Sequence, residues 1–109
     1  MRNGLIPYID GTNRWYYNDE LHREDGPAVE LINGDKIWYY HGKFHRKDGS
    51  AIEYADGSKE WYCNGKRHRR DGPAIEYVDS YKEWWYNGQY IKCSSQKEFE
   101  RLLKVIAFW

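Results

Sequence analysis

Residues 38–60 read WYYHGKFHRKDGSAIEYADGSKE, and most of the chain aligns to this stretch as copies or fragments of it. The tryptophan that opens it recurs every 23 residues, at Trp15, Trp38, Trp61 and Trp84. A fixed period of this length is typical of repeat architectures, in which each unit packs on the next. The period predicts one repeat domain over residues 1–109. Its parts are a half repeat at 3–14, full repeats at 15–37, 38–60 and 61–83, and a partial repeat at 84–94.

Each repeat carries two turn signals between segments of alternating residues. The first signal occurs as Asn18-Asp19, His41-Gly42, Asn64-Gly65 and Asn87-Gly88. The second occurs as Asp10-Gly11, Asn33-Gly34, Asp56-Gly57 and Asp79-Ser80. Asn-Gly and Asp-Gly are strong hairpin signals because a type I′ turn needs positive φ at both central residues. We therefore expect a mainly β protein, an antiparallel meander of hairpin repeats that forms a single elongated, twisted sheet.

Two-residue turns would also fix which residues face each other. Around His41-Gly42, Tyr39 would lie opposite Phe44; around Asp56-Gly57, Ile52 would lie opposite Trp61 and Glu53 opposite Glu60. One face would then be the core, formed by Ile52, Tyr54, Trp61 and His68 and by the residues 23 positions from each of them in the other repeats. The other face would carry Glu30, Glu53 and Glu76 with Tyr16, Tyr39 and Tyr62. Because two glutamates opposite each other repel, either this face is well solvated or a bulge shifts the register.

The period ends after residue 94, and a helix is expected to follow. Ser95 to Glu98 has the S-x-x-E pattern of a capping box, and Phe99, Leu102, Leu103 and Ile106 follow at helical spacing. A helix over about residues 95–108 would cover the open end of the sheet, as terminal caps of solenoids do. Alternatively, the tail IAFW at 106–109 stays exposed as a partner-binding stripe.

The composition limits the classes of partner. Lys+Arg and Asp+Glu both number 17, so no net charge attracts nucleic acid or an anionic membrane at long range. The sequence shows no secretory signal and no membrane-spanning run, and its two cysteines fit a reducing compartment. A cytoplasmic protein is expected. Cys63 stands where the other repeats have tyrosine, which predicts a free, buried thiol with a reactive or bridging cysteine as the alternative.

The most distinctive string is H-R-x-D-G-[PS]-A, which occurs at 22–28, 45–51 and 68–74. With W-Y-x-N-G and E-[LY]-x-[ND]-G-x-K, it resembles diverged MORN-like repeats, over about residues 4–92. The family's place in phage, giant-virus and bacterial proteins suggests a phage- or bacteria-encoded inhibitor of a defence or toxin protein, acting in the host cytoplasm. Arg23, Arg46 and Arg69 replace the glycine of the standard unit, so the lipid binding of some MORN proteins is not expected here.

The recurring His, Arg and Asp have two interpretations. As a functional array, they would hold phosphate or carboxylate groups. As a structural device, histidine would stack on tryptophan, arginine would pair with Asp25, Asp48 or Asp71, and Asp-Gly-Pro would turn the chain. The second interpretation is favoured because a residue present in every copy is more often needed by the repeat than by a single site. A shared metal site is not expected, since successive repeats would lie about 10 Å apart.

A basic run in the third repeat is the local candidate for a partner contact. With the nearby rings, the candidate partner-binding residues are Lys66, Arg67, Arg69, Arg70, Trp85, Tyr62, Tyr39 and Arg46. The run could bind a nucleotide or RNA by stacking and phosphate pairing, bind an acidic protein surface, or be a solvated edge that discourages strand addition.

No nucleophile elbow, phosphate loop or separate carboxylate pair is present in the sequence, so no enzyme activity, cofactor or metal is expected. The first hypothesis is a non-enzymatic module that binds a protein through an exposed aromatic and charged repeat surface. The alternative is a sequestrant of a nucleotide or cyclic nucleotide signal, or an RNA-binding module. Self-association through the sheet edge or the terminal helix is left open.

Overall fold

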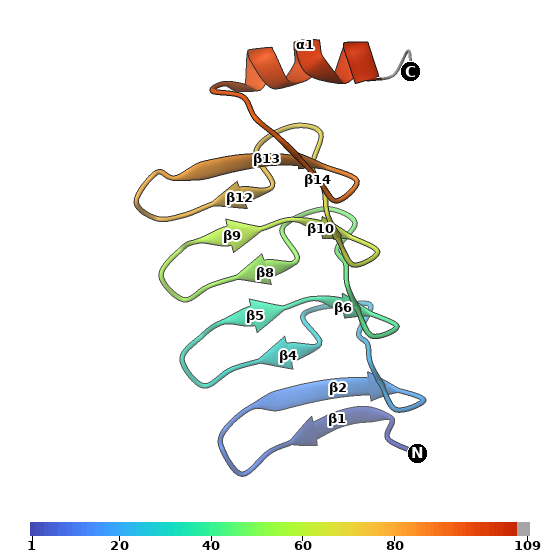
Figure 1. Cartoon of the computed structure of the whole chain (residues 1–109). Coiled ribbons are helices and arrows are strands. Elements are labelled where there is room, and N and C mark those ends of the chain that lie inside the picture. The colour runs from blue at the N-terminus through green and yellow to red at the C-terminus, as the bar shows by residue number, and fades with distance from the viewer. Residues whose placement is uncertain (107–109) are drawn as a thin grey trace.

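The computed structural model describes residues 1–106 as a column of stacked hairpins with one helix at its end (Figure 1). Its principal extents are 47 × 31 × 18 Å. The strands are β1 (Gly4–Pro7), β2 (Asn13–Tyr17), β3 (Glu20–Leu21), β4 (Val29–Glu30), β5 (Lys36–Ile37), β6 (Tyr39–Tyr40), β7 (Lys43–Phe44), β8 (Ile52–Glu53), β9 (Lys59–Glu60), β10 (Tyr62–Cys63), β11 (Lys66–Arg67), β12 (Ile75–Glu76), β13 (Lys82–Tyr86) and β14 (Gln89–Ile91). The helix is α1 (Gln96–Ile106). The expected mainly β meander with a C-terminal helix is confirmed.

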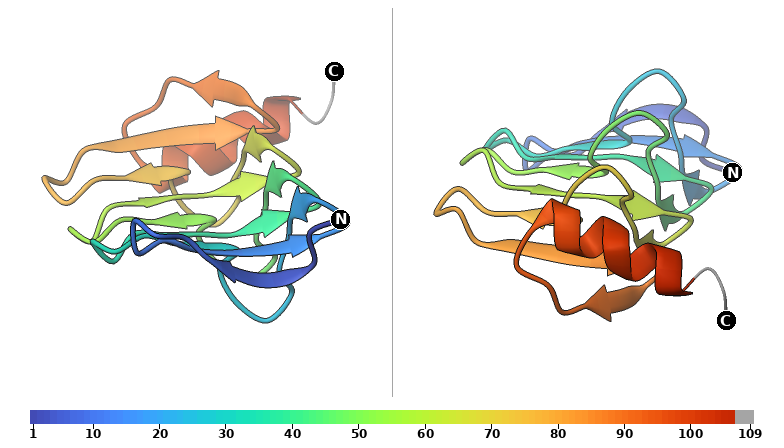
Figure 2. Two further views of the ribbon diagram at one scale, coloured as in Figure 1. Left: turned by 90° about the horizontal axis from the view of Figure 1, so that it is seen from below. Right: turned by 90° about the horizontal axis from the view of Figure 1, so that it is seen from above.

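The meander divides into a main sheet and short hairpins beside it. Ten strands form the main sheet in the order β1-β2-β4-β5-β8-β9-β12-β13-β14, with β3 paired to β2. The hairpins β6–β7 and β10–β11 are separate two-stranded ladders. In Figure 1 the long loops of the main sheet lie on the left of the column and the short hairpins on the right. Figure 2 shows that α1 lies across the end of the column next to β13.

The short hairpins have the predicted turns. His41 and Gly42 have φ of 49° and 78°, and Asn64 and Gly65 have 50° and 84°. Positive φ at both central residues is the type I′ geometry, whose twist matches that of the strands. Tyr39 is paired with Phe44, as predicted.

The long turns differ from the prediction by one residue. Ile52 is paired with Glu60 rather than Trp61, and Glu53 with Lys59 rather than Glu60. Only the glycine of the Asp-Gly pair, Gly57, has positive φ (96°) in this loop, which closes when the Tyr54 amide donates to the Ser58 carbonyl at 2.9 Å. The extra loop residue is stabilised by the Asp56 carboxylate, which accepts the Ser58 amide at 2.8 Å. The shift places Glu53 opposite a lysine, so the predicted repulsion is absent.

The same shift changes the expected faces. Glu60, which pairs with Ile52, accepts hydrogen bonds from Tyr54 (2.7 Å) and Tyr62 (2.9 Å), so Tyr62 lies on the side of Ile52. Trp61 does not share that side. It packs against Arg69, which donates a hydrogen bond to Glu76 on the opposite face. The assignment of Trp61 and His68 to the core face, and of Tyr62 to the other, is therefore wrong. Small and aliphatic residues fill the core: Ala28, Val29, Ala51, Ile52, Ala74 and Ile75.

The helix buries the last repeat. Ser95 caps it, since its Oγ accepts the Glu98 amide at 3.2 Å; the Glu98 carboxylate, which a capping box would direct to the Ser95 amide, accepts the Ser94 hydroxyl at 3.1 Å instead. Phe99 is fully buried against Trp84 and Ile91, and Ile91 is paired with Trp84 as predicted. Of the predicted tail stripe, residues 107–109 lie outside the described residues.

Candidate functional site

Each of the three full repeats contains an arginine stacked on its tryptophan. The Cζ atoms of Arg23, Arg46 and Arg69 lie 3.8, 3.9 and 3.7 Å from the ring centroids of Trp15, Trp38 and Trp61. A guanidinium over an indole is a favourable cation–π contact.

The same guanidinium also holds the H-R-x-D-G loop that follows through hydrogen bonds. Arg69 donates to the Pro73 carbonyl at 3.0 Å, to Asp71 at 2.9 Å and to Glu76 at 3.3 Å. Arg46 donates to the Ser50 carbonyl and to Glu53, and its Nε lies 3.7 Å from Asp48. Arg46 and Arg69, both candidate partner-binding residues, are thus engaged in holding the repeat. The structural interpretation of the recurring arginine and aspartate has direct support here.

The glycine of the H-R-x-D-G string makes room for this arginine. A Cβ at Gly72 would lie 2.5 Å from the Arg69 Cζ, and one at Gly49 would lie 2.9 Å from the Arg46 Cζ. No side chain fits at these positions without moving the guanidinium.

The histidines connect one repeat to the next. The Nδ1 atoms of His45 and His68 accept the backbone amides of Asn64 and Asn87 at 3.0 and 2.9 Å, and His22 accepts the His41 amide at 2.9 Å. The expected histidine–tryptophan stacking is not found among the aromatic contacts of these histidines, whose neighbours are tyrosines and His41. Burial, and then the positive charge of Arg70, lower the pKa of His68.

Histidine and tyrosine rings alternate along the short-hairpin side, a feature that we call the ring column. Ring centroids are 5.8 Å apart for Tyr17 and His22, 4.7 Å for His22 and Tyr40, and 5.7 Å for Tyr40 and His45. The column resumes with His68 and Tyr86 at 4.8 Å. Between these two parts the tyrosine position is occupied by Cys63, a free and half-buried thiol. The prediction of a buried thiol is correct only in part, because this cysteine stays partly exposed.

Two open grooves separate successive H-R-x-D-G loops. The upper groove, of about 520 Å³, lies between the second and third loops. It is lined by His45, Arg46, Lys47, Asp48, Gly49, Trp61, Tyr62, Cys63, His68, Arg69, Arg70 and Asp71. The lower groove, of about 1170 Å³, lies between the first and second loops and contains Tyr40 where the upper one has Cys63.

The residue at position x of the H-R-x-D-G string is exposed in every copy and differs in charge. It is Glu24 in the first repeat, Lys47 in the second and Arg70 in the third. The ion pairs near the upper groove involve Arg46, Arg69 and their carboxylates, and none within residues 1–106 involves Lys47 or Arg70. The upper groove is therefore bordered by two cations without an ion-pair partner in the described part of the chain.

Three remaining candidates, Arg67, Tyr62 and Trp85, cluster near Glu60. Arg67 donates to the Tyr62 hydroxyl at 3.1 Å and to the buried Glu60 at 3.5 Å, and its Cζ lies 5.1 Å from the Trp85 ring. Burial, followed by the hydrogen bond to Glu60, raises the pKa of Tyr54 far above its usual value, so this phenol stays neutral. The equivalent position is Ile37 in the preceding repeat and Glu83 in the following one, so the repeat pattern alone does not single out Glu60.

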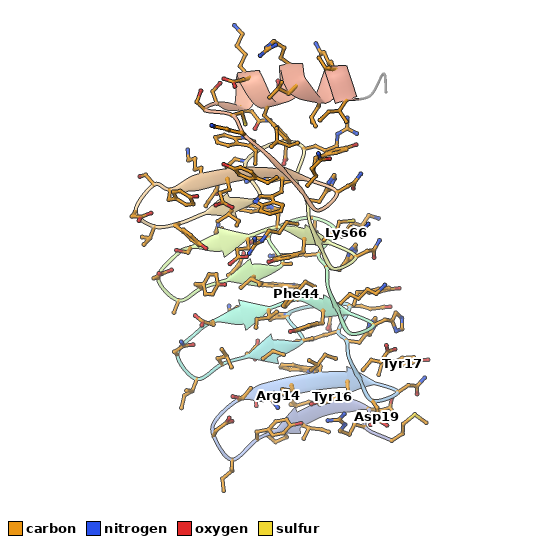
Figure 3. The ribbon with its side chains drawn as sticks, in the orientation of Figure 1. Arg14, Tyr16, Tyr17, Asp19, Phe44 and Lys66 are labelled. Carbon is orange, nitrogen blue, oxygen red and sulfur yellow. The ribbon has the colours of Figure 1, made fainter. Side chains whose placement is uncertain are left out.

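The structure therefore divides the basic run among different surroundings. Arg67 contacts Tyr62, whereas Arg69 contacts Trp61. Of the predicted cationic residues, Lys66 and Arg70 are exposed and the others are half-buried. Tyr39 is half-buried, with its ring 4.9 Å from Phe44. In Figure 3, Lys66 and Phe44 come from successive short hairpins, while Arg14, Tyr16 and Tyr17 lie on β2.

The long loops carry a row of exposed side chains that the sequence interpretation missed. At the position before each Asp-Gly, Asn-Gly or Asp-Ser turn stand Ile9, Ile32, Ala55 and Val78, one repeat apart. Ile9 is fully exposed, Ile32 is 80% exposed and Val78 is 67% exposed. Neighbouring loops touch, since the Cδ1 of Ile32 lies 2.8 Å from the place of a Cβ on Gly11. We call these four residues the tip row; its signal was an aliphatic residue placed in a turn.

Within residues 1–106, no three side chains among His, Cys, Asp and Glu gather closely enough to hold a metal ion. No helix in this part of the chain has the length and apolar composition that crossing a membrane requires. Comparison of the chain with protein-family models, with curated proteins and with solved structures finds no match. The similarity to MORN-like repeats stays a prediction.

Proposed function

We propose that the protein is a non-enzymatic binding module that holds another protein through the tip row. The observation that carries this proposal is the exposure of Ile9, Ile32 and Val78 at the ends of successive loops. A row of exposed apolar side chains along one edge is unusual on a protein surface that has no binding role. Stacked repeats present such side chains at fixed intervals over a long surface, which suits recognition of a macromolecule.

The charges around the tip row favour protein over nucleic acid. Asp10, Asp56 and Asp79 each follow a residue of the row, and all three are exposed. Carboxylates at this spacing repel a phosphate backbone, whereas they complement lysine and arginine. The partner surface that fits is an apolar strip bordered by basic side chains.

The test is a capture experiment with matched variants. Wild type, a tip variant (Ile9→Ser, Ile32→Ser and Val78→Ser) and a control variant (Lys43→Ser and Lys66→Ser) would each be immobilised and exposed to an extract of the source cells. The captured protein would be identified by mass spectrometry, purified and titrated by calorimetry. We expect the tip variant to bind at least about tenfold more weakly, since buried anchors dominate interface energies, and the control to bind as wild type does.

Equal binding by the tip variant and wild type would reject the tip row as the interface. Sedimentation equilibrium of the wild type would show whether the tip row instead pairs two copies of this chain. A dimer that the tip variant does not form would reject the proposal of a different partner. That the partner is a toxin or defence protein stays a prediction from the family resemblance, and the identity of the captured protein tests it.

A further inference from the structure

The upper groove lies at the place where the ring column lacks a ring. In the second repeat Tyr40 lies between His22 and His45, with centroid distances of 4.7 and 5.7 Å. In the third repeat the corresponding histidines, His45 and His68, line a groove together with Cys63. A thiol is much smaller than a phenol, so the replacement leaves space for a flat ring beside two imidazoles.

The hydrogen bonds of these histidines determine which nitrogen faces a ligand. Because Nδ1 of His45 and of His68 accepts a backbone amide, the neutral imidazoles carry their proton on Nε2. In the first repeat the Nε2 of His22 lies 3.7 Å from Glu24, two residues further on. The residues two positions after His45 and His68 are Lys47 and Arg70. The repeat thus brings Nε2–H donors and unpaired cations to the same border of the upper groove.

The charges of the upper groove favour an anion. Arg46, Lys47, Arg69 and Arg70 line it, against the carboxylates of Asp48 and Asp71. Asp71 is already bonded to Arg69 at 2.9 Å, and Asp48 lies 3.7 Å from Arg46. This leaves Lys47 and Arg70 to bind a phosphate, for which both side chain types are suited.

We propose that the upper groove binds a mononucleotide, with the base stacked beside His45 and His68 over Cys63 and the phosphate held by Lys47 and Arg70. Base–aromatic stacking tolerates every base because each has a flat π face. The lower groove does not offer the same site, because Tyr40 fills the ring position and Glu24 stands at its border. This site is separate from the tip row and does not depend on a protein partner.

The binding test uses calorimetric titration of the full chain with adenosine 5′-monophosphate, and with adenosine and inorganic phosphate as half-ligands. We expect saturable binding of the monophosphate at a Kd of about 1 mM or tighter, and at least about tenfold weaker binding of each half-ligand. Guanosine, cytidine and uridine monophosphates would establish which base binds best. If none of the four nucleotides gives a heat of binding at about ten times that concentration, the proposal is overturned.

The variant that decides the matter is Cys63→Tyr. It restores the ring found in the other repeats, so the protein should melt at the same or a higher temperature while nucleotide affinity falls at least about tenfold. Cys63→Ala keeps the space open and should bind as wild type does. Arg70→Gln with Lys47→Gln should weaken the monophosphate and leave adenosine unchanged. Unchanged affinity of a folded Cys63→Tyr protein would refute the site, and protein capture by the same variant should be unaffected.

Discussion

At the scale of single residues, the repeat depends on the fit between an arginine and a glycine. The Gly72→Ala substitution would place a methyl group 2.5 Å from the Arg69 Cζ and displace the guanidinium from Trp61. We expect a loss of about 1–3 kcal/mol in the free energy of unfolding, as for other overpacked sites. Urea denaturation monitored by tryptophan fluorescence measures this loss.

A double-mutant cycle separates this explanation from a backbone effect. In an Arg69→Ala background the added methyl group has no guanidinium to displace, so Gly72→Ala should cost much less there. If its cost is the same in both backgrounds, the close approach of arginine is not the reason for the glycine.

His68 makes the stability depend on pH. Its pKa in the folded protein is lowered by burial and by Arg70, so below the unfolded value of about 6.5 the unfolded state binds more protons than the folded state. The stability that neutral His68 contributes is fully present above that pH and is lost as the pH falls through the lower folded pKa. Thermal melts between pH 7.5 and pH 5 should therefore show a smaller loss in a His68→Gln variant than in wild type. Equal losses in the two proteins would contradict this explanation.

At the scale of elements, Trp84, which packs on the helix, contributes more to stability than Trp61. Trp61, which the sequence placed on the core face, is only half-buried, beneath Arg69. Trp84 is 7% exposed and packs on α1, and its Nε1 donates to Gln96 at 2.8 Å. Trp84→Ala should lose about 3–5 kcal/mol, and Trp61→Ala less, about 1–3 kcal/mol. Parallel urea melts compare them, and equal losses would contradict this ranking.

The elements also show how far the sequence could predict the structure. The Asn-Gly and His-Gly turns of the short hairpins and the Ser95 cap are local signals, and each predicted its element correctly. The register of the long loops was missed because Asp56-Gly57 is part of a wider turn closed by an aspartate side chain, which the same two letters do not distinguish. The contacts of Glu60 were missed because they depend on the shifted register of the long loops, and the tip row was missed because an aliphatic residue in a turn is not part of the strand pattern.

At the scale of the whole molecule, stability should be nearly additive over repeats because each repeat contacts mainly its neighbours. Deleting residues 15–37 joins Arg14 to Trp38 and keeps the phase of the pattern. The shortened protein should remain folded, and its longest dimension should fall by about 10 Å, the width of two strands. Circular dichroism and small-angle scattering would measure these properties.

Deleting residues 15–26 is the matched control, because it removes about half a repeat and leaves the pattern out of phase. This variant should lose cooperative unfolding. If both deletions fold equally well, the repeats are not interchangeable translated units.

The two ends of the column differ in their capacity to recruit another strand. At one end α1 covers the last hairpin, whereas β1 at the other end pairs only with β2 among the described residues. The Tyr8 amide bonds inward to the Thr12 carbonyl at 2.8 Å, so the nitrogen of the preceding Pro7 is directed to the outer edge. Proline has no hydrogen to offer there, which interrupts the row of donors that an incoming chain would need. Growth into fibrils is thus opposed at both ends by different means, a steric cover and a missing donor, so a column of interchangeable hairpins can keep a finite length.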